Sequence, residues 1–66
     1  MIDIEQAVKI AKNILGDDKN QTDENIRKSG GSSVDTLLIF QNITISQEEK
    51  EALKRRVIKR LNSIYR

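Results

Sequence analysis

The chain of 66 residues contains no cysteine and no histidine. Without them it can form no disulfide, no thiolate nucleophile and no zinc site of the usual Cys/His kind, and it has no imidazole base. The carboxylates in residues 17–24 lack the alternation of oxygen ligands that calcium loops require. We therefore expect no metal, no cofactor, no catalytic residue and no small-molecule substrate, and we predict that the chain is not an enzyme.

Long apolar segments are also absent. The longest uninterrupted apolar run covers residues 37–40, whereas a membrane-spanning helix needs roughly 20 residues. Residues 1–6 are acidic and lack the basic start and apolar core of a secretory signal. We expect no membrane association and a cytoplasmic location.

Aromatic residues and glycines are few. Phe40 and Tyr65 are the only aromatic side chains, so no platform for stacking nucleic-acid bases is visible. No strand precedes the Gly30-Gly31 pair and no Gly-Lys-Ser/Thr follows it, which excludes a phosphate-binding loop of that type. We interpret the glycine pair as part of a linker.

The small size of the chain limits its stability as a single copy. A chain of 66 residues forms one domain at most, residues 1–66, whose core supplies only about 3–5 kcal/mol unless something reinforces it. Association with another chain removes more apolar surface from water than one copy can bury. We therefore expect a protein partner, most simply a second copy in a homodimer.

The first segment has the pattern of an amphipathic helix over residues 3–15. Asp3 is placed to cap this helix by accepting from the amide of Gln6, and Gly16 is placed to end it in the left-handed conformation. The apolar residues recur at helical spacing. They are Ile4, Ala7, Val8, Ala11, Ile14 and Leu15.

Residues 17–33 differ sharply from this first segment. Ile26 is their only apolar residue besides glycine, and they close on the sequence Ser-Gly-Gly-Ser-Ser. Thr22 could cap a single helical turn that holds Ile26 against the core. We predict a long, polar, mobile loop.

Residues 34–45 allow two interpretations. As a helix, the segment would be capped by Ser32 or Ser33 and would end near Asn42. As a strand over residues 36–45, its backbone groups would need a partner strand, best supplied by a second chain in an α-β-α dimer. We favour the helix, which makes the fold all-α, a small three-helix bundle.

The last segment is predicted to be a helix over residues 46–65. Ser46 followed by Glu49 is typical of a capping box. An apolar stripe follows at helical spacing: Leu53, Val57, Ile58, Leu61, Ile64 and Tyr65. From Lys50 onward the chain has seven basic residues and one acidic residue, so positive charge is concentrated on this helix.

These patterns predict the core and an association surface. The expected core is Ile4, Val8, Ala11, Leu15, Leu38, Phe40, Leu53, Val57, Leu61 and Ile64. The expected association surface is Phe40, Val57, Leu61, Ile64 and Tyr65. We hypothesise a small non-enzymatic regulatory or interaction module that acts by protein contact and associates with itself.

Nucleic-acid binding through the basic helix face is the alternative hypothesis. The residues concerned are Lys54, Arg55, Arg56, Lys59 and Arg60. Cations in the second half of a helix are also favoured by its dipole, so a solvated surface explains the same pattern. Glu48, Glu49 and Glu51 at the start of the helix disfavour sequence-specific DNA recognition there, because carboxylates repel phosphates.

Overall fold

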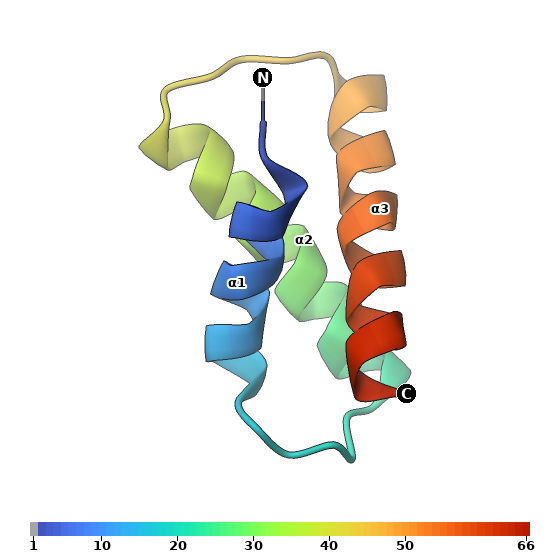
Figure 1. Cartoon of the computed structure of the whole chain (residues 1–66). Coiled ribbons are helices and arrows are strands. Elements are labelled where there is room, and N and C mark those ends of the chain that lie inside the picture. The colour runs from blue at the N-terminus through green and yellow to red at the C-terminus, as the bar shows by residue number, and fades with distance from the viewer. Residues whose placement is uncertain (1) are drawn as a thin grey trace.

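In a computed structural model that describes residues 2–66, the chain forms three helices and no strand in that range. They are α1 (Ile4–Leu15), α2 (Asp23–Phe40) and α3 (Gln47–Tyr65). Each pair of helices is in contact, with α2 crossing obliquely behind α1 and α3 (Figure 1). The predicted all-α three-helix bundle is confirmed.

α1 begins and ends where the sequence predicts. Asp3 caps it, although its carboxylate accepts from the amide of Glu5 at 3.0 Å and not from that of Gln6. Gly16 follows the last residue with a φ of 79° and a ψ of −162°. This φ is positive, as predicted, but the ψ lies outside the left-handed helical region.

The predicted loop over residues 17–33 is too long, because α2 begins at Asp23. The Thr22 hydroxyl accepts from the amide of Asn25 at 3.0 Å, and Ile26 is buried. Thr22 therefore caps a helix of 18 residues where the sequence had suggested a single turn. Ser32 and Ser33, the two serines proposed as the cap, both lie inside this helix.

The two glycines interpreted as part of a linker face α3. A Cβ atom added to Gly30 would lie 2.8 Å from Cγ1 of Ile58, so α2 and α3 approach too closely there for a side chain. Ser33 is fully buried, and its hydroxyl donates to the carbonyl of Gly30 at 2.8 Å. These small residues are helix-packing residues, and the linker interpretation is wrong.

The remaining connection, residues 16–22, is held by hydrogen bonds. The side-chain amide of Gln21 donates to the carbonyls of Leu15, at 3.2 Å, and Asp18, at 2.8 Å. At the other end of the chain, the hydroxyl of Tyr65 donates to the carbonyl of Gly16 at 2.7 Å. This connection is therefore tied both to α1 and to the end of α3.

The end of α2 decides between the helical and the strand interpretation of residues 36–45. The helix continues to Phe40, and Asn42 follows with a φ of 55°. The amide of Ile43 donates to Leu38 at 2.9 Å, and that of Asn42 to Ile39 at 3.1 Å. This is the Schellman pattern of a helix end. The strand alternative is not found.

The core lies between the three helices. It is made of Ala7, Val8, Ala11, Ile26, Val34, Leu37, Leu38, Val57, Leu61 and Tyr65. Nine of the ten predicted core residues are buried or pack against this cluster. Val8, Ala11, Leu38, Val57 and Leu61 are buried, whereas Ile4, Leu15, Leu53 and Ile64 are half-buried.

Phe40 is the predicted core residue that the structure contradicts. Its side chain is 86% exposed. The last turn of α2 extends away from the beginning of α3, and residues 41–46 bridge the gap between them (Figure 1). Phe40 therefore lies at the edge of the bundle, where no neighbouring helix covers it.

Candidate interaction surfaces

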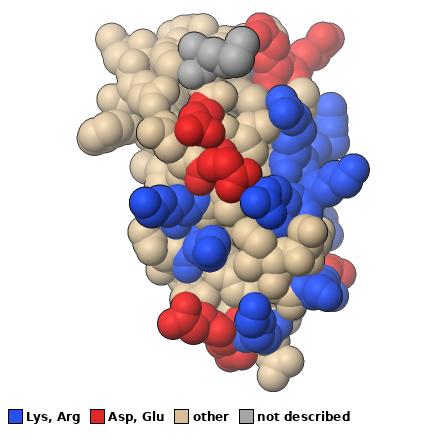
Figure 2. Space-filling model, in the orientation of Figure 1, with Lys and Arg blue, Asp and Glu red and all other residues tan. Residues whose placement is uncertain are grey.

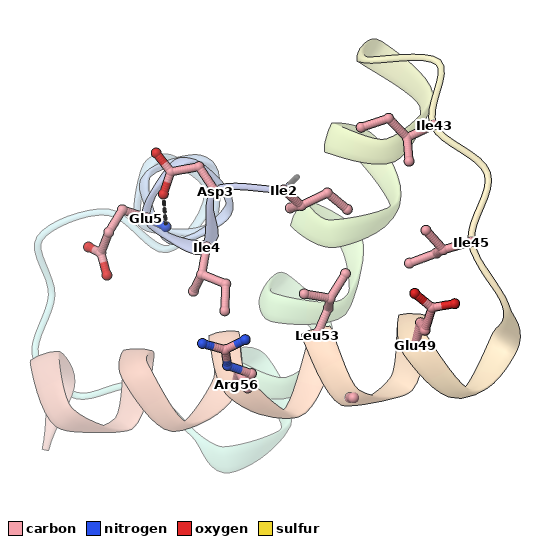
Figure 3. Close-up of a pocket in the computed structure, with 10 residues that line it drawn as sticks. Ile2, Asp3, Ile4, Glu5, Ile43, Ile45, Glu49, Leu53 and Arg56 are labelled. Atoms are coloured by element: carbon pink, nitrogen blue, oxygen red, sulfur yellow. Dashed lines mark hydrogen bonds between the residues drawn. The ribbon is translucent and has the colours of Figure 1, made fainter.

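An open groove of about 940 Å³ lies at the end of the bundle where α1 and α3 begin. Ile2 and Ile4 line it from the amino-terminal segment, Ile43 and Ile45 from the α2–α3 connection, and Leu53 from α3 (Figure 3). All five side chains are half-buried and pack against the edge of the core. The groove therefore presents apolar side chains to solvent.

Charged residues of both signs border the groove. Asp3 and Glu5 come from the start of α1, and Glu49 and Arg56 from α3 (Figure 3). Asp3 caps α1, and Glu49 forms the predicted capping box with Ser46, whose hydroxyl accepts from the Glu49 amide at 3.1 Å. These two carboxylates therefore have structural roles at helix ends.

Two adjacent apolar side chains are exposed at the end of α2, which lies at the same end of the bundle as this groove (Figure 1). Phe40 is 86% exposed and Ile39 is 80% exposed. They lie in a stretch of twelve uncharged residues, 36–47, in a chain of which 33% of residues are charged. Ile14 is the third exposed large hydrophobic residue, but it lies near the end of α1 that is far from the groove (Figure 1).

The predicted association surface is only partly available. Of its five residues, Phe40 is exposed and Ile64 is half-buried. Val57, Leu61 and Tyr65 are buried in the core of the chain itself, because the apolar stripe of α3 packs against α1 and α2. They cannot form an outer surface while the bundle is intact.

Sequence reasoning missed the groove because its lining comes from three separate segments. The sequence signal that could have indicated the groove is a set of isoleucines that the predicted core does not include. Ile2 precedes the first helix, and Ile43 and Ile45 flank Thr44 in the connection before the last helix. Three apolar residues at helix ends indicate either an edge of the core or a contact surface.

Two of the five predicted nucleic-acid contacts are engaged within the chain. Nζ of Lys54 lies 3.4 Å from Oδ2 of Asp35 on α2, and the Lys54 side chain is only 23% exposed. Nε of Arg60 lies 2.9 Å from Oε2 of Glu5 on α1. These two cations therefore join α3 to its neighbours.

The other three predicted contacts, Arg55, Arg56 and Lys59, are exposed. Within residues 2–66 they form no ion pair. Lys and Arg side chains gather along α3 in the space-filling view (Figure 2). We call these three residues the basic face.

The described part of the chain holds no group of three or more acidic side chains arranged to bind a metal ion. None of the helices within residues 2–66 is long and apolar enough to cross a membrane. Comparisons with protein-family models, curated proteins and solved structures found no match to this chain. The surface features that bear on function are the groove, the exposed end of α2 and the basic face.

Proposed function

We propose that this protein is a non-enzymatic interaction module that associates with a second copy of itself. The contact surface is the apolar end of the bundle, which comprises Ile39, Phe40 and the groove. The observation that carries the proposal is an aromatic side chain, 86% exposed, at the same end of the molecule as a groove lined by isoleucine and leucine.

The occupant of the groove is a second copy because one chain supplies both halves of the contact. Phe40 projects from the end of α2, and the groove lies between the α2–α3 connection, α3 and the start of α1. In a two-fold dimer the same patch on each subunit contacts the other. Phe40 of each copy then fills the groove of its partner, and both protruding side chains are removed from water.

The charges at this end are compatible with such a pairing. Residues 36–47 carry no charge, so the approach of two copies leaves no ion unpaired in the centre of the contact. Asp3, Glu5, Glu49 and Arg56 border the groove. A two-fold arrangement can place the arginine of one copy opposite a carboxylate of the other, at the rim of the interface.

The expected energy is large for a protein of this size. Burying one phenylalanine side chain contributes about 1.5–3 kcal/mol, and a two-fold dimer buries two. The intramolecular core of so small a domain supplies only about 3–5 kcal/mol. The apolar contribution of the two rings is therefore comparable to the net stability of the core, before the loss of translational and rotational freedom on association is subtracted.

Sedimentation equilibrium of the wild-type protein and the Phe40→Gln variant tests the proposal. We expect the wild type to form a dimer, and we expect Phe40→Gln to weaken the dimer at least about 100-fold because both copies lose the contact. Ile14→Gln is the matched control, since Ile14 is also an exposed apolar residue but lies far from the groove. Circular dichroism verifies that both variants keep their helices.

Two results would contradict the proposal. One is a wild-type protein that stays monomeric at millimolar concentration. The other is a dimer that Ile14→Gln weakens as much as Phe40→Gln does, because association would then follow general surface hydrophobicity and not the apolar end.

A further inference from the structure

We infer that the basic face of α3, formed by Arg55, Arg56 and Lys59, binds the phosphate backbone of nucleic acid without sequence preference. The inference stands on a surface that the proposed self-association does not use, except for Arg56 at the border of the groove. Some cations of α3 form ion pairs with the other helices, whereas the three of the basic face are exposed to solvent.

The acidic residues of α1 and α2 pair with only part of the charge on α3. Glu5 pairs with Arg60, Asp35 with Lys54, and Asp23 with Arg66. From Ala52 to Arg66 the helix itself contains no acidic residue. The ion pairs that hold the bundle together thus bypass the three residues of the basic face, which are all exposed.

The three cations repel one another in the free protein. Arg55 and Lys59 are four residues apart, and Arg56 and Lys59 are three apart, which makes them neighbours on the helix surface. Like charges at such spacings destabilise a helix by about 0.2–0.5 kcal/mol per pair. A bound polyanion removes this repulsion and releases its own counterions.

The shape of the surface favours nucleic acid among the polyanions. A helix rises 1.5 Å per residue, so Arg55 and Lys59 lie about 6 Å apart along the axis. One strand of a duplex carries a phosphate about every 3.4 Å along its axis, so phosphates two steps apart are separated by about 7 Å, close to the separation of these two cations. An anionic membrane fits less well, because the apolar stripe of α3 is buried in the core and cannot insert.

The surroundings of the basic face restrict it to phosphate contacts. Tyr65, the aromatic residue of α3, is buried and bonded to the carbonyl of Gly16. Glu48 and Glu49 occupy the first turn of α3 and would repel a backbone there. With no stacking side chain and no base-reading helix start, the contact carries no sequence information.

Fluorescence anisotropy with a labelled duplex of 20 base pairs and mixed sequence tests the inference. Three phosphate contacts predict a slope of log affinity against log salt of about −2.7, which is roughly a 40-fold loss between 50 and 200 mM salt. In the Arg55→Gln/Lys59→Gln variant one contact remains, so we expect a slope of about −0.9 and at least a tenfold loss of affinity at 50 mM salt.

Lys9→Gln/Lys12→Gln is the matched control, because it removes the same charge from two exposed lysines of α1. We expect it to bind the duplex within twofold of the wild type. Both variants retain Phe40 and Arg56, so sedimentation of the same samples reports self-association separately from nucleic-acid binding.

Three outcomes would overturn the inference. They are no binding of the wild type to the duplex at 50 mM salt, an equal loss of affinity in the control, and a wild-type protein that binds phosphatidylserine vesicles but not the duplex. The last outcome would assign the basic face to an anionic membrane surface.

Discussion

At the end of the bundle opposite the groove, a hydrogen bond joins the end of α3 to the end of α1. The hydroxyl of Tyr65, next to the last residue of the chain, donates to the carbonyl of Gly16 at 2.7 Å. Gly16 presents this carbonyl with a φ of 79° and a ψ of −162°, a backbone conformation that is almost confined to glycine. The conformation of Gly16 therefore positions the carbonyl through which the end of α1 is bonded to the end of α3.

Replacing Gly16 by alanine tests this role. A Cβ atom there would meet no neighbour within 4 Å, so the cost comes from the backbone conformation alone. We expect Gly16→Ala to lower the free energy of unfolding by about 1–3 kcal/mol, measured by urea denaturation. Tyr65→Phe, which removes only the hydroxyl, should cost about 0.5–1.5 kcal/mol. An unchanged stability in Gly16→Ala would contradict this account.

At the scale of the element, α2 packs against α3 through small residues at the point where the two helices cross. Gly30 allows close contact with Ile58 of α3, and Ser33 satisfies its buried hydroxyl by donating to the carbonyl of Gly30. Ile26 and Val34 supply the large apolar contacts on either side. Close packing at the crossing thus offsets the low helix propensity of glycine.

The two neighbouring glycines provide a matched pair of variants. Gly31→Ala would place its Cβ atom 3.8 Å from Cδ of Lys54, an ordinary contact, and we expect it to raise the free energy of unfolding by about 1 kcal/mol through helix propensity. Gly30→Ala gains the same propensity, but its Cβ atom would lie 2.8 Å from Cγ1 of Ile58.

Such overpacking typically costs about 1–3 kcal/mol. Gly30→Ala should therefore be less stable than Gly31→Ala by that amount, as measured by urea denaturation. Equal stabilisation of both variants would contradict the close approach of α2 and α3 at Gly30.

The contrast between α2 and the other helices explains what the sequence could predict. α1 and α3 bury valine, leucine and alanine at regular intervals, so their apolar stripes and caps predict them closely. The middle of α2 buries Ser29, Gly30 and Ser33, residues that are typical of linkers. Their role depends on a partner helix that local sequence does not reveal.

The surfaces of the bundle could likewise be predicted only in part from local sequence. The basic residues of α3 could be predicted to lie on a helix, because of their spacing along the chain. Which of them remain unpaired depends on Glu5 and Asp35, which reach α3 only in the folded bundle. The exposure of Phe40 depends on how far α2 extends beyond its neighbours, which local periodicity does not encode.

At the scale of the whole molecule, the two proposed surfaces lie on different parts of the bundle. The apolar end joins the starts of α1 and α3, the end of α2 and the α2–α3 connection. The basic face shares Arg56 with it and lies along α3, where Lys and Arg side chains gather (Figure 2). A two-fold dimer formed through the apolar end therefore carries two basic faces. Self-association then doubles the phosphate contacts available to one nucleic-acid duplex whenever both faces can reach it.

Isotope-filtered NMR of a mixed dimer tests the central claim most directly. The chain contains one phenylalanine, so aromatic protons of a phenylalanine-labelled copy report on Phe40 alone. When this copy is mixed with an isoleucine-methyl-labelled copy, we predict intermolecular contacts from the Phe40 ring to the methyl groups of Ile2, Ile4, Ile43 or Ile45. A dimer without such contacts, or with contacts confined to Ile14, would contradict the account.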